Sequence, residues 1–185
     1  MAGQFSATHR GSFFSCAVDR QQRSAITGNV VSSGNTSMNF RIYWDGDLQE
    51  ELFDGGKIDD WTGNGTSRLY IGGKNLYDYN SSSTCNSSKS TPNLQADIFG
   101  DWREEVILWN KSEPSIINIF TTNTATKYAV PTLMHDHTYR MGIAWQNVAY
   151  NQPPHLGYYL PDRFLPSIVI KDEALVEQTI ELGDS

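Results

Sequence analysis

Hydrophobic positions along this chain fall in short runs rich in β-branched and aromatic residues, and polar turn residues bound each run. Such runs are typical of β-strands. Helical composition is confined to residues 171–178, because Gly, Asn, Ser and Thr interrupt every longer window. The pattern predicts an all-β fold, with strands over residues 37–44, 68–72, 105–109, 115–121, 138–145 and 156–160.

A weak internal repeat adds a possible architecture to this fold class. The chain contains two segments that align without gaps, Asp45-Gly46-Asp47-Leu48-Gln49-Glu50-Glu51-Leu52 and Phe99-Gly100-Asp101-Trp102-Arg103-Glu104-Glu105-Val106. A spacing of about fifty residues is typical of four-stranded propeller blades. The repeat therefore favours stacked or radial β units over a single sandwich. At this spacing the chain would form about four blades, too few to close a large propeller.

Composition and charge limit the classes of function. The 185 residues are 38% apolar, which is enough for the core of one domain, so we expect a single domain over residues 1–185. The formal net charge is -7, and this acidic balance argues against nucleic-acid and anionic-membrane partners. No apolar run approaches the roughly 20 residues that cross a bilayer. Residues 1–7 contain neither the basic nor the apolar region of an export signal.

The second segment of the repeat has the composition of a calcium-binding loop. Carboxylates stand at positions one, five and nine of this loop, as Asp97, Asp101 and Glu105, and Gly100 stands at position four. Ca²⁺ takes roughly six to eight oxygen ligands, and a tight loop with glycine can direct side chains and carbonyls at one centre. The alternative is that these carboxylates are solvated turn residues.

The first segment is a variant of the same loop. It supplies Asp45, Asp47 and Glu51 at positions three, five and nine, with Tyr43 at position one. Two aligned copies favour Ca²⁺ over simple turns, and more so at the second loop than at the first. Zinc is disfavoured, because no histidine or cysteine has ligand spacing near either loop.

Four segments resemble the C-terminal part of the rhamnogalacturonan lyases of polysaccharide lyase family 11: FRIYWDGD at 40–47, LQADIFGDWREEVI at 94–107, LMHD at 133–136 and IAWQNVAYNQPPH at 143–155. The resemblance implies part of an eight-bladed β-propeller and several structural calcium ions. It implies endolytic or exolytic cleavage of the rhamnose–galacturonate linkage of rhamnogalacturonan I, a pectin-type polysaccharide, by β-elimination. It also implies a secreted or periplasmic parent enzyme.

Family members are considerably longer than this chain. We therefore expect a C-terminal fragment whose general base lies before Met1, and which is weak or inactive as a lyase alone. Open blade edges would also favour self-association. From a different class of function, the alternative is a non-catalytic, calcium-stabilised carbohydrate-binding module, and a purely structural β domain is a third.

β-Elimination from a uronate requires a cation that neutralises the carboxylate and a base that removes the C5 proton. The resemblance places a carboxylate-binding lysine at Lys89, in the segment that begins at Asn86, although Ser87 and Ser88 replace the Gly-Thr expected before it. We therefore predict Lys89 as the catalytic cation and Asn86 as a substrate-binding residue. The alternative is a solvated loop lysine.

Asn147 and Tyr150 form the second part of the predicted substrate site. They lie near Trp145 and a Pro-Pro pair, and together could form a groove wall for a sugar ring. A core role is the alternative for Tyr150, and we favour it for Trp145.

Other polar residues give weaker signals. Arg41 and Arg103 are interpreted as structural partners of the acidic loops. His135, His137 and His155 are interpreted as turn or surface residues rather than as acid–base or metal-binding groups. A disulfide between Cys16 and Cys85 is left open, because their spacing gives no geometry.

Overall fold

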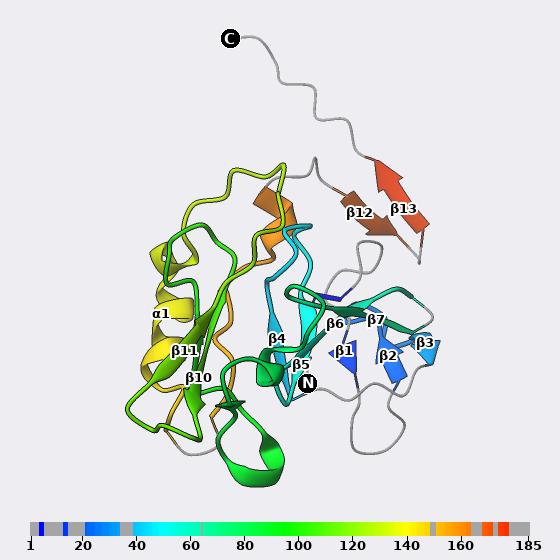
Figure 1. Ribbon diagram of the computed structural model, residues 1–185. Helices are drawn as coiled ribbons and strands as arrows, with labels where there is room; N and C mark the ends of the chain where they lie inside the picture. Colours follow the sequence, from blue (N-terminus) through cyan, green and yellow to red (C-terminus); the bar gives the residue numbers. More distant parts are fainter. Residues whose placement is uncertain are drawn as a thin grey trace.

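The computed structural model describes residues 4–5, 13–14, 21–33, 39–63, 65–148, 151–163, 168–171 and 174–177. Within these residues the strands form four antiparallel sheets (Figure 1). The same part of the chain contains one α-helix, α1 (His137–Ala144), and four short 3-10 helices, η1 (Leu76–Asp78), η2 (Ser87–Lys89), η3 (Leu133–His135) and η4 (Leu160–Arg163). None of the described helices is long and apolar enough to cross a membrane.

Two four-stranded sheets form the centre of the molecule. The first contains, in sequence order, β4 (Phe40–Ile42), β5 (Glu51–Asp54), β6 (Lys57–Trp61) and β7 (Thr66–Leu69). The second is centred on β10 (Glu105–Asn110): β11 (Ile117–Phe120) pairs with one edge, while β8 (Ser82–Ser83) and β9 (Leu94–Ala96) pair with different residues of the other edge.

Two smaller sheets complete the described strands. One joins β1 (Phe13–Phe14), β2 (Gln21–Arg23) and β3 (Val30–Ser33), and the other is the hairpin of β12 (Ile168–Lys171) and β13 (Ala174–Glu177). In Figure 1, α1 and the three-stranded sheet lie at opposite sides of the molecule, with β4 and β5 between them.

The internal repeat of the sequence is also a repeat of structure. In the hairpin of β4 and β5, Phe40 lies opposite Phe53 and Ile42 opposite Glu51. In that of β9 and β10, Leu94 lies opposite Ile107 and Ala96 opposite Glu105. The two registers coincide under the sequence alignment. We call the two connections the first loop (residues 43–51) and the second loop (residues 97–105).

The backbone of the two loops repeats as well. Gly46 and Gly100 have φ angles of 88° and 78°, and the non-glycine residues Leu48 and Trp102 have φ angles of 76° and 69°. A positive φ is unfavourable for a residue with a Cβ atom. Both side chains are almost fully buried, with 1% and 2% exposure. Their burial in the core compensates for this backbone conformation.

The hydrophobic core has two main parts. One lies between the two four-stranded sheets and contains residues of both, namely Phe40, Ile42, Trp44, Phe53, Ile58, Leu76, Val106, Leu108 and Phe120. The other joins the two loops to α1 and its flanking segments, through Tyr43, Leu48, Trp102, Val130, Leu133, Tyr139 and Leu160. Each loop is therefore anchored in the core by buried side chains, Tyr43 and Leu48 in the first and Trp102 in the second.

The structure corrects the expected architecture. The all-β class holds, but none of the described sheets closes or joins a ring, so the prediction of part of an eight-bladed β-propeller is wrong. The two copies of the repeat share one core instead of following one another around an axis. The blades whose open edges were expected to self-associate are not formed.

Several local predictions are also wrong. Residues 138–145 form α1 instead of a strand, because the carboxylate of Asp136 caps the helix by accepting a hydrogen bond from the Tyr139 amide. Residues 156–160 contain no strand. The described residues of the segment with helical composition are strand residues, Lys171 in β12 and 174–177 in β13. Trp145, interpreted as a core residue, is 53% exposed.

Candidate functional site

The first loop gathers three carboxylates. One oxygen atom from each of Asp45, Asp47 and Glu51 lies within 4.8 Å of the others. The loop backbone holds all three, because the amide of Trp44 donates to Glu51 at 2.6 Å, that of Gln49 donates to Asp47 at 2.7 Å and that of Asp47 donates to Asp45 at 3.2 Å. Three converging carboxylates provide the oxygen ligands that a hard divalent cation prefers.

The electrostatics of this cluster also favour a cation. Burial and the neighbouring carboxylate of Asp47 raise the pKa of Asp45 to about 6. The pKa of Glu51 is raised well above its usual range, mainly by burial and further by the neighbouring carboxylates of Asp45 and Asp47. Asp60 on β6 also faces the cluster, and its pKa is raised by burial and by Asp47. The carboxylates thus lose hydration on burial and repel one another, and a bound cation would offset both of these costs.

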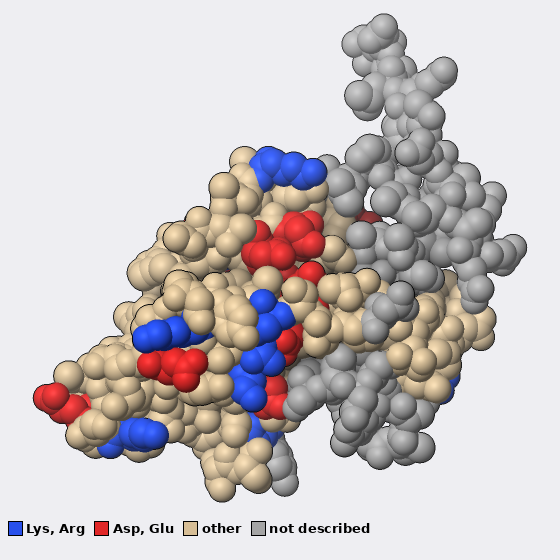
Figure 2. All heavy atoms as spheres, turned by 45° about the vertical axis from the view of Figure 1, so that its right-hand side comes forward, with Lys and Arg blue, Asp and Glu red and all other residues tan. Residues whose placement is uncertain are grey.

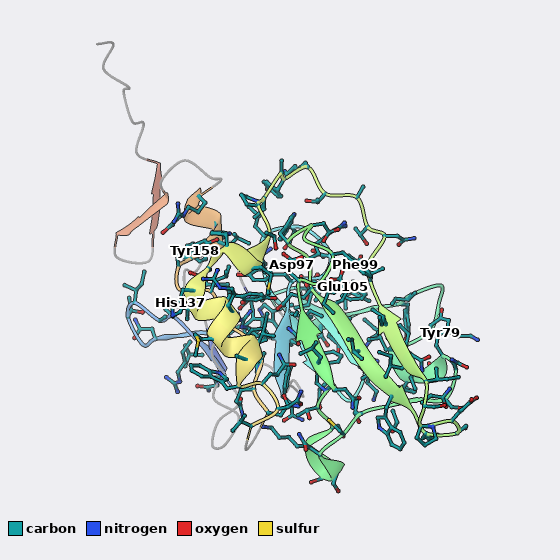
Figure 3. All side chains as sticks on the ribbon, turned by 90° about the vertical axis from the view of Figure 1, so that its left-hand side faces the viewer. Tyr79, Asp97, Phe99, Glu105, His137 and Tyr158 are labelled. Atoms are coloured by element: carbon teal, nitrogen blue, oxygen red, sulfur yellow. The ribbon has the colours of Figure 1, made fainter. Side chains whose placement is uncertain are left out.

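The carboxylates of the second loop accept hydrogen bonds from protein donors. Asp97 is 1% exposed and accepts hydrogen bonds from the Gly100 amide at 2.8 Å and from Thr132 Oγ1 and the Leu133 amide at 2.7 Å each. Figure 3 shows Glu105, the first residue of β10, next to Asp97, which directly follows β9.

Glu105 and Asp101 are engaged in the same way. Glu105 accepts from the amides of Ile98 and Phe99 and from Thr121 Oγ1, and Asp101 forms an ion pair with Arg103. Among the described residues, the only group of three or more acidic, His or Cys side chains with this convergence is that of the first loop. The structure thus brings together the predicted ligands of the first loop, although the sequence favoured the second.

A buried ionic network lies between the two loops. Arg41 is 0% exposed and forms an ion pair with Glu50, and its Nε donates to Nδ1 of His155 at 2.9 Å. Glu104, equally buried, accepts from the Tyr43 amide and from Gln95 Nε2.

Glu104 also accepts from Tyr139 Oη at 2.7 Å. Burial raises the pKa of Glu104 to about 7, and the Arg41 cation opposes that shift. The interpretation of Arg41 and Arg103 as structural partners of the acidic loops is confirmed. Sequence reasoning missed the burial of Glu50 and Glu104. The feature that could have indicated it is the Glu-Glu pair, which occurs at the same position in both copies of the repeat.

The predicted substrate residues that the structure describes lie around a single turn. Asn86 Nδ2 donates to Thr91 Oγ1 at 2.7 Å, and Lys89 Nζ donates to the carbonyl oxygen of Asn151 at 2.9 Å. Asn147 accepts a hydrogen bond from Asn151 Nδ2 at 3.2 Å. One cation and several amides therefore converge, which suits a sugar that carries a carboxylate and hydroxyl groups.

The protein holds Lys89 from two sides. Asn39 Nδ2 donates to the carbonyl oxygen of Lys89 at 2.5 Å, and the ammonium group reaches Asn151 on the other side. Burial lowers the pKa of this half-buried lysine. Tyr150 lies outside the described residues. Asn151, which contacts Lys89, Thr91 and Asn147, was missed because no local motif distinguishes it.

The described histidines lie at turns and helix ends or against Arg41. His135 Nδ1 lies 2.6 Å from the Thr132 carbonyl oxygen, and His137 is the first residue of α1, directly after the Asp136 cap. Burial and the Arg41 cation lower the pKa of His155 to about 3, so this ring is neutral although the residue is exposed overall. Cys85 is a free thiol, and Cys16 lies outside the described residues.

Surface charges of both signs are mixed on the side shown in Figure 2. Acidic and basic side chains of the described residues lie next to one another there, without a continuous basic patch. This agrees with the acidic net charge of -7.

Comparison with known proteins identifies related sequences. Residues 1–167 match the model of the rhamnogalacturonan lyase family 11 C-terminal domain. Two proteins of Bacillus subtilis (strain 168) are similar: the rhamnogalacturonan endolyase YesW, 48% identical over 137 residues, and the rhamnogalacturonan exolyase YesX, 44% identical over 144 residues. These alignments cover 73% and 71% of this chain but only 21% and 22% of the relatives, so the chain spans about a fifth of their length.

Solved structures give the same result. The crystal structure of YesW superposes with a TM-score of 0.73 at 36% identity, and a rhamnogalacturonan lyase of Bacillus licheniformis with a TM-score of 0.71 at 41% identity. Both comparisons cover 86% of this chain and 26% of the other.

Proposed function

Since the chain belongs to rhamnogalacturonan lyase family 11 and matches its C-terminal domain, we propose that it is the C-terminal portion of a secreted or periplasmic rhamnogalacturonan lyase. The relatives at 48% and 44% identity are named as an endolyase and an exolyase of rhamnogalacturonan, which supports this polysaccharide as the substrate. The observation that carries the proposal is the convergence of Lys89, Asn86 and Asn147 around the Thr91 turn.

In this proposal Lys89 is the catalytic cation. Its ammonium group neutralises the uronate carboxylate, so that the C5 proton becomes acidic enough to be removed. A base then takes that proton, the bond between C4 and the leaving oxygen breaks, and a double bond conjugated with the carboxylate forms. The amides of Asn86 and Asn147 hold sugar hydroxyls. The base belongs to the longer portion of the lyase that precedes this domain in its relatives.

Ca²⁺ has a structural role in the proposal. Asp45, Asp47 and Glu51 would hold the ion, which supplies the positive charge that their mutual repulsion requires. The ligands first predicted for the second loop, Asp97, Asp101 and Glu105, are not among the groups that converge in this way, and Arg103 already pairs with Asp101, so the proposal for calcium rests on the first loop.

The assay incubates the full chain with rhamnogalacturonan and calcium, follows the ultraviolet absorbance of the conjugated uronate, and measures binding in parallel. We expect binding with little or no elimination, and loss of binding by about 10-fold or more in Lys89→Ala. Lys74→Ala is the matched control, because Lys74 is an exposed lysine over the ring of Tyr79. Equal binding by Lys89→Ala and the wild type would remove Lys89 from the site.

A second candidate is a non-catalytic, calcium-stabilised carbohydrate-binding module. It is favoured by the share of 21–22% of the relatives' length that the chain spans, and by the amide groups that surround Lys89. The discriminating experiment restores the preceding portion of a relative in trans or by fusion. Elimination that then depends on Lys89 supports the lyase, whereas binding with no Lys89-dependent elimination supports the module.

A further inference from the structure

Asn151 is the residue at which the segments of the proposed substrate site meet. It is 2% exposed and has a φ angle of 48°, in the left-handed region that asparagine tolerates better than most residues. The segment that begins at Asn151 lies next to the turn of Thr91 and Pro92, some sixty residues earlier in the chain. A buried polar side chain at such a crossing fixes the segments that it bonds.

The side-chain amide of Asn151 binds two of these segments. Its Nδ2 lies 3.0 Å from the carbonyl oxygen of Pro92, 3.2 Å from Thr91 Oγ1 and 3.2 Å from Asn147 Oδ1. The Pro92 carbonyl can only accept a hydrogen bond, so the nitrogen and not the oxygen of the amide must face it.

The backbone of Asn151 binds a third group. Its carbonyl oxygen accepts the hydrogen bond from Lys89 Nζ at 2.9 Å. Thr91 Oγ1, which Asn151 contacts, also accepts from Asn86 Nδ2. Lys89 and Asn147 are thus bonded directly to Asn151, and Asn86 is connected to it through a single hydroxyl group.

We propose that Asn151 is a positioning residue of this site: its side chain fixes Asn147 and the Thr91 turn, and its carbonyl oxygen fixes the ammonium group of Lys89. The inference rests on the proposed function. A lysine side chain has many rotamers, and a lysine that is already ordered loses less rotamer entropy when substrate binds.

Two substitutions separate the side chain from the backbone. Asn151→Gly keeps the left-handed conformation and the carbonyl oxygen but removes the amide. Asn151→Asp keeps the shape but places an oxygen against the Pro92 carbonyl and Asn147 Oδ1, where the amide donated. The matched control is Asn118→Asp on β11, whose amide donates to the Asn80 carbonyl and to Ser82 Oγ.

The main experiment is calorimetric titration of the full chain with a rhamnogalacturonan oligosaccharide, with thermal unfolding to verify that each variant is folded. We expect Asn151→Asp to weaken binding by about 10-fold and Asn151→Gly by somewhat less, with Asn118→Asp within about 2-fold of the wild type. The same change in a Lys89→Ala background should weaken binding by a clearly smaller factor, because the two residues act together. Equal factors in both backgrounds, or no loss in a folded Asn151→Gly, would overturn the proposal.

A second readout requires no ligand. Exchange of the Lys89 ammonium protons with water, followed by nuclear magnetic resonance, reports how firmly that group is held. We expect faster exchange in Asn151→Asp and no change in Asn118→Asp. If the wild type binds no oligosaccharide, the proposed function fails, but this exchange still decides the positioning role: an unchanged rate in Asn151→Asp refutes it and a faster one supports it.

Discussion

The first and second loops share one backbone and differ in what neutralises their carboxylates. In each, an amide donates to the last glutamate: Trp44 to Glu51 in the first loop, and the aligned Ile98 to Glu105 in the second. In the first loop the remaining carboxylates, Asp45 and Asp47, accept from loop amides but also converge with Glu51, without a positively charged partner in the loop. In the second they face threonine hydroxyls, backbone amides and Arg103.

Two aligned positions account for most of this difference. Asp45 corresponds to Phe99, which is 62% exposed, so the second loop lacks one of the three converging carboxylates. Gln49 corresponds to Arg103, and both donate to the preceding aspartate, but only arginine brings a positive charge. Under the calcium proposal, the same scaffold is completed by a cation from solution in the first loop and by one of its own side chains, Arg103, in the second.

The largest effect should come from the residue that joins the loops. Glu104→Ala leaves three buried donors, on Tyr43, Gln95 and Tyr139, without their acceptor. We expect a loss of about 3–5 kcal/mol in the free energy of unfolding, measured with urea. Glu113→Ala, at an exposed position, should stay within about 0.5 kcal/mol of the wild type. A loss as small as that of the control would mean that the loops do not depend on each other.

The pH dependence of stability should show the same residue. Burial raises the pKa of Glu104 from 4.5 to about 7, so between these values the folded state retains a proton that the unfolded state has released. Stability must then fall as pH rises through this window, by roughly 3 kcal/mol. Glu104→Gln should remove this part of the slope when both proteins are unfolded in excess calcium. Identical slopes would show that Glu104 does not titrate as described.

Calcium should separate the loops directly. At 100 times its dissociation constant, a ligand that binds only the folded state adds about 2.7 kcal/mol. We expect Asp45→Asn to abolish the rise in melting temperature between chelator and calcium, and Asp101→Asn to preserve it. The reverse result would move the metal to the second loop. Superimposable wild-type melting curves would remove calcium from both.

The two loop glycines should differ in what they tolerate. A Cβ atom at Gly46 would lie 2.8 Å from Thr126 Cβ, whereas at Gly100 the nearest atom is Thr132 Cβ at 3.8 Å. Alanine costs about 1–2 kcal/mol at either position because φ is positive. Gly46→Ala should lose a further 1–3 kcal/mol or so from overpacking. Equal melting temperatures for the two variants would contradict the packing difference.

The smallest effect should come from moving the cation. Gln49→Arg places a positive charge beside Asp47, as Arg103 stands beside Asp101. Without calcium we expect stabilisation by up to about 1 kcal/mol, and with calcium a weaker affinity. The control is Gln21→Arg, on a strand away from the loop. Unchanged calcium affinity in Gln49→Arg would show that Gln49 does not set the charge of the loop.

Sequence reasoning found what is encoded locally. The gapless repeat predicted equivalent loops, and their hairpin registers agree with it. The all-β class and the partners of Arg41 and Arg103 also followed from the sequence. It missed the arrangement of the sheets, because a repeat does not show whether its copies surround an axis or share a core. It missed α1 as well, although Asp136 provided a capping signal.

The residues of the two loops alone could not show which loop is better suited to bind a metal. Whether Asp97 and Glu105 bind a metal depends on donors from Thr121, Thr132 and Leu133, which follow the loop by tens of residues. The same holds for Asn151, whose partners precede it by about sixty residues. Hydrogen bonds between segments that are distant in sequence determine both the state of the second loop and the role of Asn151, and the spacing of residues in the sequence does not predict such bonds.

The segment that carries Asn86 and Lys89 leaves and rejoins a single strand. β8 pairs with the end of β10 at Trp109, and β9 pairs with its beginning at Glu105. Residues 84–93 therefore form a connection whose two ends are both held by pairing with the same strand. Trp109 holds both ends: its indole N–H donates to the carbonyl oxygen of Thr84, and its backbone amide donates to Asn93 Oδ1. Such an insert can be lengthened, shortened or exchanged without moving the sheet. Residues 84–93 are therefore a segment that protein engineering can replace to change sugar specificity while the sheet stays the same.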